Sequence, residues 1–217
     1  MRRLRQKIKK NYNQIKRRLT WSLYRKRKIL NADLKALIDK ATKTSTLKLH
    51  LCCGGNKYPG YINVDIVPLE GTDAIMKIPQ DLFSVSSDTA SEILIENGFE
   101  HFYRYEQDDF LKECYRILIK GGRLVIRGVP DFDLITNAYL NKKQGNISAT
   151  FDLYEVYRMT HGEPTPKNSP HQLHKDIFTK GSVKELLKHH KFNIEEMQDK
   201  VFRGENTAIG FDVVAIK

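Results

Sequence analysis

Short apolar runs alternate with segments of helical spacing along most of the chain. The apolar runs predict strands over 46–52, 61–66, 73–76, 92–96, 123–129, 191–198 and 208–217. Apolar positions three and four residues apart predict helices over 31–44, 103–120, 131–141 and 181–190. Strands that alternate with helices indicate an α/β fold, in which a mostly parallel sheet is covered by helices on both faces.

Residues 142–175 carry neither pattern and are rich in proline, histidine and asparagine. We predict an irregular insertion there, which serves as a substrate lid within a single domain of residues 31–217. The length of 217 residues agrees with one such domain and a short extension.

The first thirty residues have a pattern of their own. Apolar side chains recur every three or four residues on one helix face, at Leu4, Ile8, Tyr12, Ile15, Leu19 and Leu23. Thirteen of the 37 basic residues lie in this segment, and none of the 26 acidic residues does. The remaining 24 basic and 26 acidic residues nearly balance, so the net charge of +11 belongs to a basic amphipathic helical extension over 1–30.

Such a helix is typical of binding to an anionic membrane surface. It is also compatible with RNA phosphates, with a partner helix, or with a solvated tail. No apolar stretch is long enough for a membrane span, and no apolar region follows the basic residues as in a signal peptide. The three cysteines form no disulfide framework, so we expect a cytoplasmic protein. From the basic helix we expect that the extension rests on the membrane.

The stretch "LHLCCGGNKYPGYINVD", residues 49–65, needs a chemical interpretation. A zinc site needs about four ligands, a redox pair usually reads Cys-x-x-Cys, and a nucleoside triphosphate loop needs Gly-Lys-Ser/Thr. None of these patterns is present. What remains is a glycine turn after the first strand and Asp65 at the end of the second, which together suit the ribose of a nucleoside-containing cofactor.

Four segments extend this interpretation: "LKLHLCCGGNKYPGYINVDI", "ILIENGFEHF", "FLKECYRILIKGGRLVIRGVPDFD" and "LHKDIFTKGSVKELLKHHKF". In order and spacing they resemble class I S-adenosylmethionine (SAM)-dependent methyltransferases, above all a small, mainly bacterial group linked to surface-glycan biosynthesis. The resemblance runs from about residue 46 to 217. It implies a Rossmann-like, three-layer αβα fold with an antiparallel final strand, and SAM as the cofactor.

The resemblance also implies roles for single residues. The loop under the methionine part of the cofactor is formed by Cys52, Cys53, Gly54, Gly55 and Asn56. Asp65 would hold the ribose hydroxyls, Ile66 would lie against the adenine, and Asp73 or Asp81 would meet the adenine amine. Glu96 and Asn97 would line the methyl-transfer end of the pocket, near Glu100 and His101.

Two features depart from the family pattern. Cys52 replaces the first glycine of the loop, which would cost about 1 kcal/mol or more if that position requires φ > 0. About eight residues separate the first two strands, whereas a parallel crossover usually takes about a dozen. We therefore expect the usual first helix to be trimmed to a turn.

The acceptor is inferred from what the sequence lacks and from its histidines. The Asn/Asp-Pro-Pro-aromatic motif of amine-directed base methyltransferases is absent, since residues 96–99 read Glu-Asn-Gly-Phe. His101, His171 and His174, with Asp131 after the fifth strand, are candidates for deprotonating a hydroxyl. We expect an O-methyltransferase for a glycan, glycolipid or other small polar acceptor. An RNA methyltransferase that uses the basic arm and an inactive methyltransferase-like scaffold are the alternatives.

Overall fold

The computed structural model describes residues 36, 38–39, 47–162 and 170–217. The predicted basic helix over 1–30 lies outside the described residues. So does most of the predicted helix over 31–44, of which Ala36, Ile38 and Asp39 are helical. Within the described part of the chain, no helix is long and apolar enough to cross a membrane.

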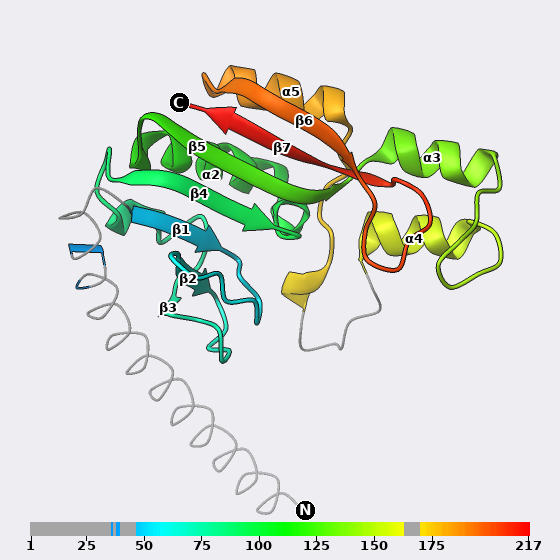
Figure 1. The fold of residues 1–217 in the computed structure, drawn as a ribbon, viewed down its shortest axis with the longest axis horizontal. Helices are drawn as coiled ribbons and strands as arrows, with labels where there is room; N and C mark the ends of the chain where they lie inside the picture. Colours follow the sequence, from blue (N-terminus) through cyan, green and yellow to red (C-terminus); the bar gives the residue numbers. More distant parts are fainter. Residues whose placement is uncertain (1–35, 37, 40–46, 163–169) are drawn as a thin grey trace, which may run out of the picture.

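A seven-stranded sheet forms the centre of the molecule, with the strand order β3-β2-β1-β4-β5-β7-β6 (Figure 1). The first five strands pair in parallel, and β7 is antiparallel to both of its neighbours. This arrangement confirms the predicted Rossmann-like sheet with an antiparallel final strand. The strands are β1 Leu47–Leu51, β2 Ile62–Asp65, β3 Ala74–Ile75, β4 Ala90–Glu96, β5 Leu118–Pro130, β6 Asn193–Lys200 and β7 Gly210–Ile216.

The main apolar core lies between one face of the sheet and two helices, α2 (Arg104–Ile117) and α5 (Lys180–His189). On this face Leu49, Ile93 and Leu124 are neighbours in the strand register. Figure 1 shows both helices behind the sheet. The amphipathic pattern predicted these helices because every third or fourth side chain of each is apolar. The buried side chains of α5 are all apolar, and so are those of α2 except Gln107.

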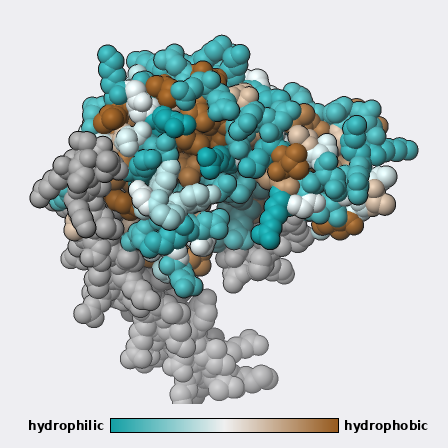
Figure 2. All heavy atoms as spheres, in the orientation of Figure 1, coloured by the Kyte–Doolittle hydropathy of each residue, from teal (hydrophilic) through white to brown (hydrophobic). Residues whose placement is uncertain are grey.

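The opposite face of the sheet is far more polar. Lys48, Glu92 and Arg123 are neighbours in the strand register on this face. Figure 2 shows this side of the molecule as mostly hydrophilic. No helix is present in the connection 52–61, so the trimmed crossover between β1 and β2 is confirmed. The glycine-rich loop after β1 is consequently held by the ends of the strands and not by the start of a long helix.

Two helices pack against each other beyond the β5 end of the sheet, α3 (Phe132–Leu140) and α4 (Leu153–His161) (Figure 1). The expectation that 142–175 is irregular was wrong for α4. Asp152 caps this helix by accepting hydrogen bonds from two backbone N–H groups, at Tyr154 and Glu155. The short 3₁₀ helices are η1 Leu82–Ser84, η2 Phe99–His101 and η3 Pro170–Gln172.

Candidate functional site

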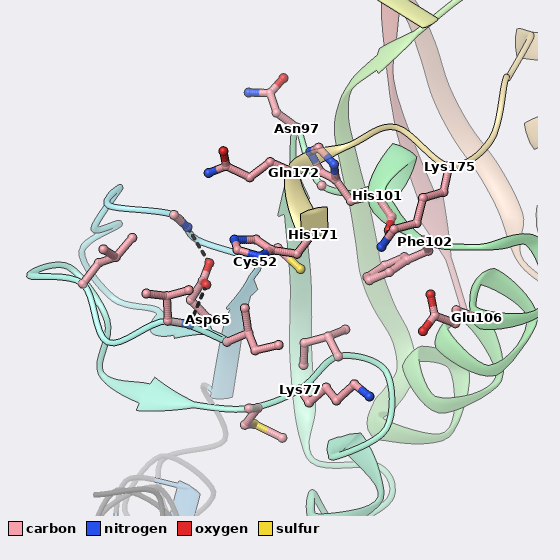
Figure 3. A pocket seen from close by; sticks show the side chains of 17 residues that line it. Cys52, Asp65, Lys77, Asn97, His101, Phe102, Glu106, His171, Gln172 and Lys175 are labelled. Atoms are coloured by element: carbon pink, nitrogen blue, oxygen red, sulfur yellow. Dashed lines mark hydrogen bonds between the residues drawn. The ribbon is translucent and has the colours of Figure 1, made fainter. Parts of the chain in front are cut away.

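A cavity of about 480 Å³ lies at the carboxyl ends of β1, β2 and β4 (Figure 3). In this sheet β1 pairs with β2 on one side and with β4 on the other, so the chain order reverses here. Open α/β sheets bind ligands at such a reversal. The lining includes Cys52, Gly54, Asp65, Ile66, Leu69, Met76, Ile78, Asn97, His101, Phe102, His171, Gln172 and Lys175.

Asp65 is the best-fixed acid of this cavity. It ends β2 and is 9% exposed. One carboxylate oxygen accepts from the Gly54 backbone N–H at 2.8 Å, and the other accepts from that of Val67 at 3.0 Å (Figure 3). Each oxygen keeps a second lone pair, so the carboxylate can still accept two hydroxyl groups of a ligand.

The glycine-rich loop has the strained backbone that the sequence suggested. Cys52 adopts φ 54°, where a glycine would be unstrained. A Cβ atom at Gly98 would lie 3.0 Å from that of Cys52, so the loop after β1 and the loop after β4 approach closely here. Burial, together with the nearby carboxylate of Asp65, raises the pKa of the Cys52 thiol, which therefore acts as a cavity wall and not as a thiolate.

Only some of the other loop residues line the first cavity. Gly54 lines the cavity, whereas Cys53, Gly55 and Asn56 do not. The Cys53 side chain is buried and its sulfur lies 3.8 Å from the Thr72 hydroxyl. These three residues shape the loop backbone without facing the cavity.

Apolar side chains form the wall beside Asp65. Ile66 is 47% exposed and lines the cavity together with Leu69, Met76 and Ile78. A flat aromatic base could rest against such a wall. The two carboxylates expected to meet the adenine amine have other partners. Asp73 accepts from the Asn63 backbone N–H and from Lys57. Asp81 accepts from the Lys77 backbone N–H. Neither carboxylate lines the cavity.

Asn97, directly after β4, lines this cavity and a second one beside it. Its φ is 48°, and its side chain lies over Gly128 so closely that a Cβ atom there would be 2.0 Å from the amide oxygen. The glycine in β5 is therefore needed for the position of Asn97. Glu96 points the other way, accepting from the Tyr58 hydroxyl at 2.8 Å, and does not line either cavity.

The second cavity has a volume of about 310 Å³ and is lined by six polar or charged residues and three apolar ones. It shares Asn97, His101 and Gln172 with the first cavity, so the two meet at these residues. The remaining lining residues are Glu100, Pro130, Arg158, Met159, His174 and Phe202.

Two histidines and a glutamate face one another in the second cavity. The rings of His101 and His174 lie 5.1 Å apart between centroids. Burial lowers the pKa of both imidazoles, and the neighbouring His101 helps to bring that of His174 to about 4. Burial raises the pKa of Glu100 to about 8. Burial therefore favours the uncharged form of all three side chains.

The other two predicted acid–base residues, His171 and Asp131, do not line the second cavity. His171 lines the first cavity but not the second. Asp131 lines neither cavity and is completely buried. Its carboxylate caps α3 by accepting from the backbone N–H groups of Asp133 and Leu134, and also accepts from that of Lys180.

Several lining residues were missed from the sequence. Arg158 and Met159 lie on α4 and Gln172 on η3, all within the segment expected to be irregular. The signal for α4 was the pair Asp152 and Glu155 ahead of Val156 and Met159, an N-cap followed by helical spacing. Phe202 lies far along the chain, and no local pattern marks it.

Comparisons with known proteins agree with this architecture. The sequence matches no model of a known protein family and no curated protein. Among solved structures, a SAM-dependent methyltransferase from Archaeoglobus fulgidus is similar with TM-score 0.51 and 16% identity, over 88% of this chain and 94% of that one. A SAM-dependent methyltransferase from Methanosarcina mazei is similar with TM-score 0.51 and 17% identity, over 83% of this chain and 96% of that one. The chain therefore has the Rossmann-like fold found in SAM-dependent methyltransferases.

Proposed function

We propose that the protein is a SAM-dependent methyltransferase and that the first cavity holds the cofactor. The carrying observation is the Asp65 carboxylate, held by backbone N–H groups at the reversal point of the sheet. Asp65 would accept both ribose hydroxyls, Ile66 and Met76 would flank the adenine, and the Cys52–Gly54 backbone would lie under the methionine portion. SAM supplies a methyl group activated on a sulfonium sulfur.

The second cavity is the proposed acceptor site. Polar side chains such as Asn97, Glu100 and Gln172 can hydrogen-bond hydroxyl groups, and Phe202 gives one aromatic wall. This combination favours a small polyhydroxylated acceptor, such as one sugar of a glycan or glycolipid. RNA is a weaker candidate, because the chain beyond residue 30 is nearly neutral and so lacks the positive charge that phosphates require.

His101 is the residue best placed to act on the acceptor, because it lines both cavities where they meet. We expect His101→Ala to lower turnover about 100-fold, the usual effect of losing a positioned proton acceptor, and to change SAM affinity only a few-fold. The assay is transfer of a labelled methyl group from SAM to a pool of polar cell-extract metabolites and lipid-linked glycans.

His161→Ala is the matched control, since His161 stacks on Tyr157 on the outside of α4 and lines neither cavity. It should retain full turnover. Transfer to the same acceptor at the wild-type rate by the His101 variant would remove His101 from the reaction. Labelling of RNA alone would favour the nucleic-acid alternative.

For residues 1–30 we propose docking to an anionic membrane surface, because they hold thirteen basic residues and no acidic one. Deleting them should abolish sedimentation with vesicles that contain phosphatidylglycerol while leaving SAM affinity unchanged. Neutral phosphatidylcholine vesicles serve as the control. Undiminished sedimentation of the truncated chain would refute the membrane role.

A further inference from the structure

The three side chains at the floor of the second cavity have the geometry of ligands. One potential ligand atom each from Glu100, His101 and His174 lies within 4.8 Å of the other two. All three residues line the cavity. Two imidazoles and one carboxylate are a common donor set for divalent transition metals, and they leave coordination positions open to a ligand.

Hydrogen bonds orient both imidazoles for such a role. The Nδ1 atom of His101 lies 3.1 Å from the Leu173 carbonyl oxygen, and that of His174 lies 2.9 Å from the Met159 carbonyl oxygen. A carbonyl can only accept, so Nδ1 carries the proton in both rings. The Nε2 lone pairs are then available, and backbone carbonyls are the usual outer partners of metal-binding histidines.

The burial of Glu100 is an independent indication that this group binds a cation. The side chain is only 3% exposed, and its Oε2 atom has no hydrogen-bond partner. The nearest ring nitrogen, His101 Nε2, is 3.9 Å from Oε1, too far for a hydrogen bond. A buried carboxyl oxygen without a partner is costly, and a bound cation removes that cost.

A second histidine cluster shows what distinguishes this one. Asp108, His189 and His190 also place ligand atoms within 4.8 Å of one another. There, however, Asp108 already pairs with the Lys112 ammonium at 2.5 Å, and His189 is exposed. Asp108 also lies 2.8 Å from Nε2 of the buried His190, so its carboxylate has close partners that Glu100 lacks, and this second cluster provides the internal control.

We propose that Glu100, His101 and His174 bind one divalent transition-metal ion at the floor of the second cavity. Imidazole donors favour ions such as Zn²⁺, Co²⁺ or Fe²⁺ over Mg²⁺, which prefers oxygen ligands. All three residues line the cavity in which the acceptor is proposed to bind, so an ion held by them would be within reach of the acceptor.

The role of the ion, but not its binding, rests on the proposed function. A metal ion lowers the pKa of a hydroxyl group that it coordinates. The two histidines would then act on an acceptor hydroxyl through the ion and not as free bases. Because ion binding needs neither SAM nor acceptor, it can be tested separately from methyl transfer.

The test is titration of chelator-treated full-length protein with Zn²⁺ by calorimetry, and with Co²⁺ by visible absorption. We expect one high-affinity equivalent and cobalt absorption bands, with no high-affinity binding of Mg²⁺. Glu100→Gln preserves size and hydrogen bonding and should weaken binding at least about 100-fold, as should His174→Ala. His189→Ala, in the second cluster, should leave the affinity unchanged.

Circular dichroism shows whether each variant is folded, and the near-isosteric Glu100→Gln keeps the test decisive if His174→Ala unfolds. Absence of high-affinity Zn²⁺ and Co²⁺ binding by the folded wild-type chain would overturn the proposal. So would equal affinity in Glu100→Gln, or loss of binding in His189→Ala. Separate titration with S-adenosylhomocysteine (SAH) shows whether the cofactor site works whatever the metal result.

Discussion

Replacing Asp65 by alanine is expected to lower the affinity for SAH about 100-fold or more. The variant loses the proposed acceptor of two ribose hydroxyls, and hydrogen bonds to a charged group contribute about 1.5–3 kcal/mol each. It also releases the Gly54 and Val67 N–H groups, which loosens the loop under the ligand. The measurement is calorimetric titration of SAH into the wild type and the variant.

Asp152→Ala is the matched control for the structural part of this effect. The Asp152 carboxylate also accepts from two backbone N–H groups, at Tyr154 and Glu155, but it lies outside both cavities. SAH affinity should be unchanged in this variant. Wild-type affinity in folded Asp65→Ala would show that the acid at the end of β2 does not hold a ligand.

Replacing Arg158 by methionine is expected to lower the free energy of unfolding by about 3–5 kcal/mol, because it leaves two buried carboxylates without their cation. Arg158 is 6% exposed and pairs with Glu155 at 2.7 Å and with Glu205. The Glu155 carboxylate also accepts from the backbone N–H groups of Asn146 and Ile147. The group therefore ties α4 to two loops of the chain.

Urea unfolding of Arg158→Met measures this effect, and Lys188→Met provides the control. Lys188 pairs with Glu185 at the surface, with 55% of its side chain exposed, so its loss should cost less than about 1 kcal/mol. Adding Glu205→Gln to Arg158→Met should recover part of the stability, because it removes one of the unpaired charges. Equal stability of the two single variants would contradict the assigned role of the buried group.

The sheet could be predicted from the sequence because every strand carries its own local signal. The apolar run at 92–96 and the run at 123–129 each became a central strand, β4 and β5. Glycine at 54 and an acid at 65 likewise mark the two strand ends that meet at the first cavity. The strain at Cys52 followed from the same local pattern.

The second cavity, proposed as the acceptor site, is formed by contacts that local sequence patterns do not predict. Asp131 follows a strand as a catalytic acid would, yet its carboxylate is used by the N-termini of α3 and α5. Glu96 and Asn97 are adjacent, but the strand alternation turns Glu96 toward Tyr58 on the polar face. His101 and His174 meet only because the chain after α4 returns to η2, a long-range contact.

The central claim is that the first cavity binds SAM, and the most direct measurement is calorimetric titration of SAM and SAH into the full-length wild-type protein. We expect saturable binding with a Kd of about micromolar, and a rise in the unfolding temperature with SAH. Adenosine alone should bind more weakly, because it lacks the methionine portion that we propose to lie over the Cys52–Gly54 backbone. A folded protein that shows no heat of binding and no thermal shift with millimolar SAM or SAH would contradict the claim.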